Sequence, residues 1–193
     1  MSSEDQVQRI QSTIKKMQDS PLLNKLKNSK KGVLVDISSS MLGRVESQIT
    51  RHDVVQKVMD DHIKQLGLNI YWFNDDFGKA VDGALPHPTG GTDMANAFNE
   101  MKNKGILHVV LLSDGEPNSE EEAFDAAEGM QFDIIYIGNP PTPSFLLKLG
   151  NVQGNSVQAV NMITQANGLV NLLGDKIKKL LIPAQSSGTF YGK

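Results

Sequence analysis

Two kinds of hydrophobic pattern alternate along the 193-residue chain. Short, uninterrupted apolar runs indicate strands buried on both faces, whereas apolar residues that recur every three or four positions indicate amphipathic helices. Strands are predicted at residues 33–35, 68–73, 106–113, 133–137 and 157–160, with a short edge strand at 79–85. Helices are predicted at residues 44–66, 93–104, 144–149 and 164–182, with a further helix that begins after Ser119. This alternation predicts an α/β fold built on parallel strands.

The two ends of the chain differ from this central part. Apolar residues recur at helical spacing over residues 4–18 and predict an amphipathic helix. That helix either packs against the flank of the domain, which we favour, or docks onto a partner. Residues 186–193 are polar and contain glycine, which is typical of a loose tail. We therefore divide the chain into an amino-terminal helical extension at 1–29, a domain at 30–183 and a flexible tail at 184–193.

Side chains that carry oxygen follow two of the predicted strands. Asp36, Ser38 and Ser40 come directly after the first apolar run, and Asp114 comes directly after the third. Parallel strands present functional groups at their carboxyl ends, so these side chains are expected at one edge of the sheet. Thr92 follows two glycines, which permit positive φ and a close approach of the backbone to an ion.

These five candidate ligands offer only oxygen. Such a set suits a hard divalent cation such as Mg²⁺ or Mn²⁺ and makes zinc a poor candidate. Two carboxylates roughly balance the charge of the ion, but the three hydroxyls donate weakly and leave the metal electrophilic on its open side. An acidic group from another molecule is therefore the natural last ligand.

The three-part pattern of Asp36-x-Ser38-x-Ser40, Gly-Gly-Thr92 and Ser113-Asp114-Gly115 resembles the von Willebrand factor A domain and its metal-ion-dependent adhesion site. The resemblance covers roughly residues 30–182. It implies a Rossmann-like, three-layer α/β/α fold with a mostly parallel six-stranded sheet, strand order 3-2-1-4-5-6 and one antiparallel edge strand. It also implies that the five candidate ligands contact Mg²⁺, Mn²⁺ or Ca²⁺, directly or through water. An Asp or Glu of a protein partner would then complete the site.

One position departs from the family pattern. Many members carry glycine where this chain has Ser39, between the two candidate serine ligands. Serine there is expected to alter how closely the loop backbone approaches the ion without removing a ligand.

Two features near the motifs have a structural interpretation as well. Thr92 could cap the helix predicted to start at residue 93, although the resemblance favours a metal contact. Ser119 and Glu122 have the spacing of a capping box. The acidic run at residues 120–122 is therefore assigned to the start of a helix and not to a metal site.

Composition narrows the function classes. The formal net charge of -3 gives no support to nucleic-acid binding driven by bulk positive charge, although residues 1–31 contain seven Lys or Arg against three Asp or Glu. The absence of cysteine excludes disulfides and thiolate metal sites. The first residues are polar, and no window approaches the roughly 18 apolar residues that span a bilayer. A cytoplasmic location is therefore expected.

Several metal-dependent or nucleotide-dependent enzymes need parts that this chain lacks. A haloacid-dehalogenase-like phosphatase would need a second Asp where Ser38 stands, and no glycine-rich phosphate loop follows the first strand. The four histidines have no metal or triad spacing, and His108 is expected to be a satisfied core residue. We therefore predict a non-enzymatic, metal-dependent protein-interaction module. Two alternatives stay open: a scaffold or adaptor subunit, for example beside an ATPase, whose metal only stabilises the loops, and a metal-dependent hydrolase of unrecognised type.

Overall fold

The computed structural model describes residues 31–46, 48–63, 69–152, 154–159 and 166–181. The predicted helix at 4–18 and the predicted tail at 184–193 lie outside these residues, so the division of the chain into extension, domain and tail stays a prediction. Within the described ranges, no helix is both long enough and apolar enough to cross a membrane.

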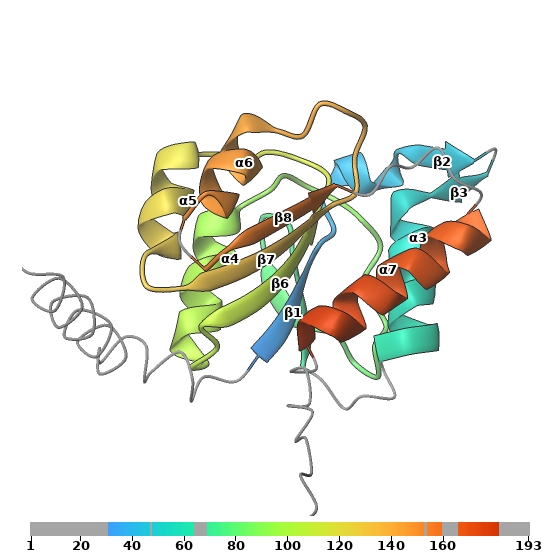
Figure 1. The fold of residues 1–193 in the computed structure, drawn as a ribbon, viewed down its shortest axis with the longest axis horizontal. Helices are drawn as coiled ribbons and strands as arrows, with labels where there is room; N and C mark the ends of the chain where they lie inside the picture. The colour runs from blue at the N-terminus through green and yellow to red at the C-terminus, as the bar shows by residue number, and fades with distance from the viewer. Residues whose placement is uncertain (1–30, 47, 64–68, 153, 160–165, 182–193) are drawn as a thin grey trace, which may run out of the picture.

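A single six-stranded sheet forms the centre of the molecule (Figure 1). Every neighbouring pair is parallel except β4 with β5 at one edge. Numbered along the chain, the strand order is 3-2-1-4-5-6, so the predicted Rossmann-like sheet with one antiparallel edge strand is confirmed. In spatial order the strands are β5 (Phe77–Lys79), β4 (Ile70–Phe73), β1 (Lys31–Asp36), β6 (His108–Ser113), β7 (Gln131–Tyr136) and β8 (Ser156–Ala159).

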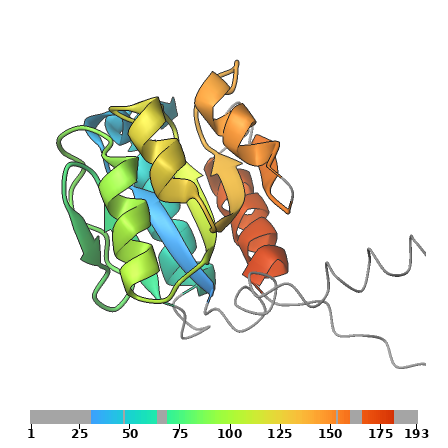
Figure 2. The same cartoon turned by 90° about the vertical axis from the view of Figure 1, so that its left-hand side faces the viewer.

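Helices cover both faces of the sheet and give the three-layer arrangement (Figure 2). Strand β1 serves both cores, because neighbouring side chains of a strand point to opposite faces. Val33 and Val35 join the core on one face and Leu34 joins the core on the other, and all three are fully buried. One core lies under α3 (Arg51–Val58) and α7 (Ala166–Leu181), and the other under α4 (Met94–Asn103), α5 (Glu120–Ala127) and α6 (Ser144–Gly150).

The prediction of one helix over residues 44–66 is wrong in its first part. Arg44–Glu46 (β2) and Ile49–Thr50 (β3) form a small antiparallel pair instead, and α3 begins only at Arg51. A single turn of π-helix, Met59–Ile63, continues from the end of α3.

A capping box explains this late start of the helix. The Thr50 hydroxyl accepts a hydrogen bond from the backbone N of Asp53 at 3.1 Å, and Asp53 Oδ2 accepts one from the backbone N of Thr50 at 2.8 Å. The chain therefore turns helical at residue 51 and not earlier. Val45 and Ile49 pack against the core from extended backbone, so their spacing of four residues imitates a helix.

The antiparallel edge strand lies earlier than predicted. It was expected at 79–85, but β5 spans Phe77–Lys79 and is followed by a turn with positive φ at Asp82 (52°) and Gly83 (80°). Positive φ is incompatible with a continuing strand. Where they are described, the other predicted strands and helices agree with the structure to within two residues at each end.

Candidate metal centre

The loops that carry the candidate ligands lie at the carboxyl edge of the sheet, where β1 and β6 are neighbours. Asp36 is the last residue of β1, and Asp114 directly follows β6. Beyond this pair the sheet continues to β4 on one side and to β7 on the other. This is the topological switch point, at which open α/β sheets bind their ligands.

Neutral donors hold Asp36 in one orientation. Its side chain is fully buried, and its Oδ1 accepts from the backbone N of Ser38 at 2.8 Å while its Oδ2 accepts from Ser113 Oγ at 2.7 Å. Burial raises the pKa of Asp36 to about 6; the hydrogen bonds from Ser113 and Ser38 act in the opposite direction, and the charge of Asp114 adds to the rise. The sequence pattern included Ser113 but assigned its side chain no role, although its place at the end of a buried strand was the available signal.

Ser38, Ser40 and Asp114 form a continuous hydrogen-bonded chain. Ser38 Oγ and Ser40 Oγ share a hydrogen bond of 2.9 Å, and Ser40 Oγ donates to Asp114 Oδ1 at 2.7 Å. A 3-10 turn, Ser39–Leu42, sets this spacing, and the fully buried side chain of Met41 anchors the turn in the core. Three of the five candidate ligands are thus in direct contact.

Ser39, the position that departs from the family pattern, ties two loops together. Its backbone N and its Oγ both donate to the carbonyl oxygen of Gly90, at 3.1 and 3.0 Å. Gly90 belongs to the loop that carries Thr92. Serine at this position therefore adds a hydrogen bond between the two ligand loops.

Asp75, in the turn after β4, fixes the glycine loop. Gly91 N donates to Asp75 Oδ2 at 2.8 Å, and Asn118 Nδ2 donates to Asp75 Oδ1 at 3.4 Å. Gly90 has a φ of 71°, and a Cβ built there would lie 2.4 Å from Asp75 Oδ2. The backbone conformation therefore favours glycine at position 90, and a Cβ there would push against the Asp75 carboxylate that holds Gly91. Sequence reasoning missed the role of Asp75.

Thr92 lies at the end of the glycine loop and is buried. Its backbone N donates to Asn118 Oδ1 at 3.0 Å. Asp93, and not Thr92, caps α4, because Asp93 Oδ1 accepts from the backbone N of Asn96 at 3.0 Å. Among the described residues no hydrogen bond uses the Thr92 hydroxyl. The structure therefore brings the loop of Thr92 beside the other loops but does not join its side chain to the remaining candidate ligands.

Arg51 is the residue of the candidate centre that sequence reasoning missed most clearly. Its Nη1 donates to Asp114 Oδ2 and also to the carbonyl oxygen of Ser40, at 3.3 Å. The prediction had placed Arg51 in the middle of a long helix. The capping box between Thr50 and Asp53 was the signal that could have placed it at a helix start.

The residues present fit a hard divalent cation. The cluster offers only carboxylate and hydroxyl oxygens, and Asp114 already pairs with a cation of the protein, the guanidinium of Arg51. Within the described ranges, no group of three or more His, Cys, Asp or Glu could hold a metal. The hydroxyls would therefore be needed to complete a metal site, and such a set favours Mg²⁺, Mn²⁺ or Ca²⁺ over zinc.

The acidic run at residues 120–122 serves the start of a helix, as predicted. Ser119 caps α5, because its Oγ accepts from the backbone N of Glu122 at 3.4 Å. Glu120 pairs with Lys148 Nζ at 3.0 Å on the surface. These carboxylates are therefore explained without a metal.

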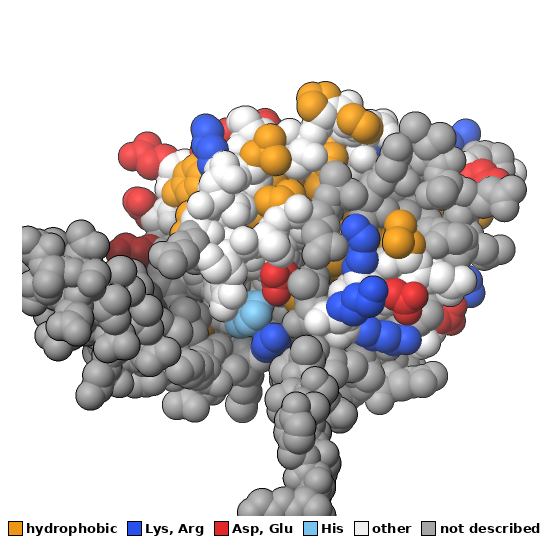
Figure 3. All heavy atoms as spheres, viewed as in Figure 1, with side chains coloured by type: hydrophobic (Ala, Val, Ile, Leu, Met, Phe, Trp, Pro, Cys, Tyr) orange, Lys and Arg blue, Asp and Glu red, His pale blue; other side chains and the backbone are white. Residues whose placement is uncertain are grey.

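Hydrophobic side chains are exposed at the same edge of the sheet. Figure 3 shows them gathered over α6 and the loop that precedes it. That loop follows β7 and carries the exposed Pro140 and Pro141, and Leu147 on α6 is 47% exposed. An apolar surface therefore lies on the β7 side of the candidate centre.

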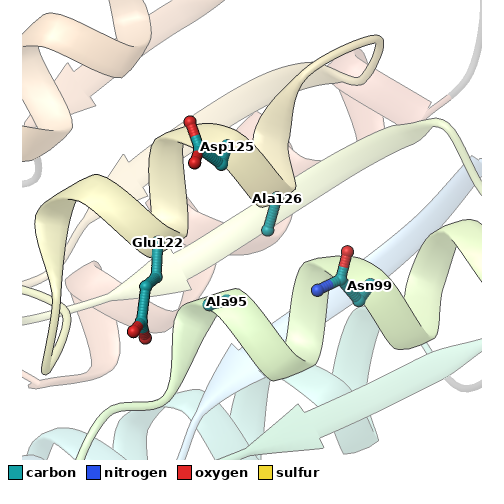
Figure 4. A pocket seen from close by; sticks show the side chains of 5 residues that line it. All are labelled: Ala95, Asn99, Glu122, Asp125 and Ala126. Atoms are coloured by element: carbon teal, nitrogen blue, oxygen red, sulfur yellow. The ribbon is translucent and has the colours of Figure 1, made fainter.

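A shallow pocket between α4 and α5 is separate from this centre (Figure 4). The small side chains of Ala95 and Ala126 leave the space, whose volume is about 390 Å³. Asn99, Glu122 and Asp125 complete the lining, so the pocket contains none of the candidate ligands.

Among known proteins, this chain resembles solved structures in its fold. No family model matches the sequence, and no curated protein matches it. A von Willebrand factor type A structure from Catenulispora acidiphila aligns with a TM-score of 0.59 at 14% identity, over 79% of this chain and 42% of its own. The SpRpn10 VWA domain aligns with a TM-score of 0.51 at 14% identity, over 75% of this chain and 94% of its own. The fold resembles that of von Willebrand factor A domains.

This A-domain-like fold accounts for the position of the candidate centre, because it places the ends of β1 and β6 side by side. This chain covers less than half of the first of the two structures. At 14% sequence identity, these two structures show a similarity of fold alone.

Proposed function

We propose that this chain is a protein-interaction module that binds Mg²⁺, Mn²⁺ or Ca²⁺ and uses the ion to capture an Asp or Glu side chain of a protein partner. The observation that carries the proposal is the hydrogen-bonded chain of Ser38, Ser40 and Asp114, which lies at the switch point of an A-domain-like sheet together with the buried Asp36. With Thr92, these residues would hold the ion.

Each group would contribute a distinct property to the site. Asp36 supplies a buried charge whose orientation is fixed by Ser113 and by the backbone of Ser38. Asp114 supplies the second charge, and the hydroxyls supply neutral oxygens. A bound divalent ion would offer the remaining coordination to a carboxylate from outside.

The surface beside the centre supports a protein as the partner. Pro140, Pro141 and Leu147 expose apolar side chains on the β7 side of the polar cluster. Protein interfaces combine an apolar core with a few polar contacts that fix the orientation of the partner. A carboxylate captured at the ion and an apolar contact next to it would provide both.

The cluster favours binding over catalysis. In the described part of the chain, no third carboxylate or histidine joins Asp36 and Asp114. A hydrolase would need a general base within hydrogen-bond reach of a metal-bound water. Both carboxylates are assigned to the ion, so neither is left to act as a general base, and we propose no catalytic step.

One observation favours the scaffold alternative, in which a metal only stabilises the loops. Protein groups already hold the ligand loops together through the contacts of Ser39 with Gly90, Asp75 with Gly91, and Arg51 with Asp114. Such loops would keep their shape without an ion. Binding of a partner would then not depend on a metal ion.

The first test is a calorimetric titration of wild type and Asp36→Asn with Mg²⁺ and Mn²⁺. The substitution keeps the size of the side chain and removes one of the two ligand charges, so we expect the affinity to fall by at least about 100-fold. Asp125→Asn is the charge-matched control, since Asp125 is exposed on α5 and lines the separate pocket. We expect the control to bind both ions like wild type.

The same three proteins then capture partners from cell extract, with Mg²⁺ or with EDTA, and mass spectrometry identifies what is retained. Partners retained only by wild type and Asp125→Asn in Mg²⁺ would support the proposal. Partners retained equally in every condition would support the scaffold alternative. A folded wild type that binds neither Mg²⁺ nor Mn²⁺, nor Ca²⁺ in the same titration, would refute the metal-dependent function.

A further inference from the structure

Arg51 places a cation of the protein itself at the candidate metal centre. Its guanidinium contacts both the carboxylate of Asp114 and the carbonyl oxygen of Ser40. The side chain of Asp114 is fully buried and that of Arg51 is only 14% exposed. Water therefore screens this ion pair much less than it screens an ion pair on the surface.

The local backbone is built around this contact. A Cβ on Gly43 would lie 3.0 Å from both Cζ and Nη1 of Arg51, so glycine leaves room for the guanidinium. The backbone N of Arg51 donates to the carbonyl oxygen of Gly43 at 2.9 Å, and the capping box of Thr50 fixes the start of α3. With its backbone held in this way, Arg51 can leave Asp114 only by rotation of its side chain.

We propose that Arg51 competes with the divalent ion for Asp114 and thereby sets the metal affinity of the site. The inference rests on the proposed function, because it concerns the same centre. With Arg51 in place, Asp36, Asp114 and Arg51 carry one net negative charge instead of two. An incoming ion meets a like charge and has to share or displace the hydrogen bond of Arg51 to Asp114. The site is therefore weaker for a metal ion than its donor set alone would make it.

The test measures Mn²⁺ affinity for wild type, Arg51→Gln and Arg51→Lys. Removal of the charge in Arg51→Gln is expected to tighten Mn²⁺ binding by about tenfold or more, and Arg51→Lys, which keeps the charge, should stay within about threefold of wild type. Arg44→Gln is the matched control, because Arg44 is exposed on the neighbouring β2 and undergoes the same change of charge. Its affinity should also stay within about threefold of wild type.

The outcomes separate this inference from the proposed function. If Arg51 only supported the fold of Asp114, its replacement would weaken Mn²⁺ binding, which is the opposite sign. Equal or weaker binding by Arg51→Gln, with wild type binding Mn²⁺, overturns the inference and leaves the proposed function intact. Absence of binding in every protein overturns both. Tighter Mn²⁺ binding by Arg51→Gln supports the inference, also if wild type binds Mn²⁺ too weakly to be measured.

A second measurement does not depend on Arg51→Gln, which leaves Asp114 buried without its cation and could unfold. The side-chain Nε–H signal of Arg51 is followed by NMR in wild type, with Arg51→Lys for assignment. Added Mg²⁺ is expected to move this signal as the guanidinium is released or shared. A signal that stays unchanged while wild type becomes saturated with Mg²⁺ overturns the inference.

Discussion

Asp36 and Asp133 are both buried in the sheet, and β6 supplies a partner to each from opposite ends. Ser113, the last residue of β6, donates to Asp36, whereas His108, the first, shares a hydrogen bond of 2.7 Å with Asp133. Asp133 also accepts from Ser156 Oγ at 2.6 Å. The hydrogen bond expected for His108 is confirmed, but the residue is only partly buried at the start of β6 and is not part of either core.

The pKa values of the two aspartates shift in opposite directions. Burial acts to raise the pKa of Asp133, but the hydrogen bonds from His108 and Ser156 and the charges of His108 and Lys31 outweigh it, so the pKa is lowered. For Asp36 burial prevails over the neutral donors, and the pKa is raised to about 6. A carboxylate whose charge is compensated inside the sheet is structural. At the edge that carries the candidate centre, only neutral donors meet the charge of Asp36.

From the contrast between Asp36 and Asp133, we expect the largest effect in the pH dependence of the unfolding free energy, measured without metal. Because the pKa of Asp36 is raised from 3.8 to about 6, its contribution to stability is fully present below pH 3.8 and is lost as the pH rises through about 6. The loss is up to about 3 kcal/mol of unfolding free energy. Urea denaturation in EDTA from pH 4 to pH 7 measures it in wild type, and Asp36→Asn should lack it. If the unfolding free energies of wild type and Asp36→Asn changed with pH in the same way, the proposed contrast between Asp36 and Asp133 would be wrong.

Asp133→Asn should have a smaller effect, of about 2 kcal/mol of destabilisation, because it breaks charge-assisted hydrogen bonds within the sheet. Denaturation at pH 7 measures this loss, and Mn²⁺ titration should show an affinity within about threefold of wild type. The stability that Asp133 contributes is present above pH 3.8 and is lost as the pH falls through its lowered pKa. A large loss of Mn²⁺ affinity in Asp133→Asn would contradict its structural role.

Ser39→Gly should have the smallest effect and tests the tie between the ligand loops. It removes one hydrogen bond to Gly90 from an exposed side chain, so we expect a loss of about 0.5–1 kcal/mol in chemical denaturation. Mn²⁺ affinity should change by less than about threefold, since no ligand is removed. A tenfold change would mean that Ser39 itself contributes to ion binding.

The sequence was most informative where its pattern has one physical explanation. Runs such as residues 33–35 are apolar at every position because both faces of the sheet are covered, and this made the parallel strands predictable. The order of the strands came from the family resemblance and is confirmed. The five candidate ligands were readable because they lie in short segments next to those strands, and their role as metal ligands stays a prediction.

The long-range contacts that support the site could not be predicted, because the two residues of each contact are distant in the sequence. Asp75 and Gly91 are 16 residues apart, and Asn118 and Thr92 are 26 apart. Arg51 and Asp114 are 63 apart. No local pattern encodes such contacts, since each depends on how two loops meet after the sheet has formed.

The long sequence separations at the candidate centre also concern folding. Ser40 and Asp114 are 74 residues apart, and Asp36 and Ser113 are 77 apart, so the unfolded chain does not hold these oxygens together. An ion that binds at the centre would therefore bind the native state in preference to the unfolded state. By mass action, an ion concentration 100 times its Kd would stabilise the native state by about 2.7 kcal/mol. A rise in the concentration of free divalent ions around the protein would then raise the temperature at which the whole sheet unfolds.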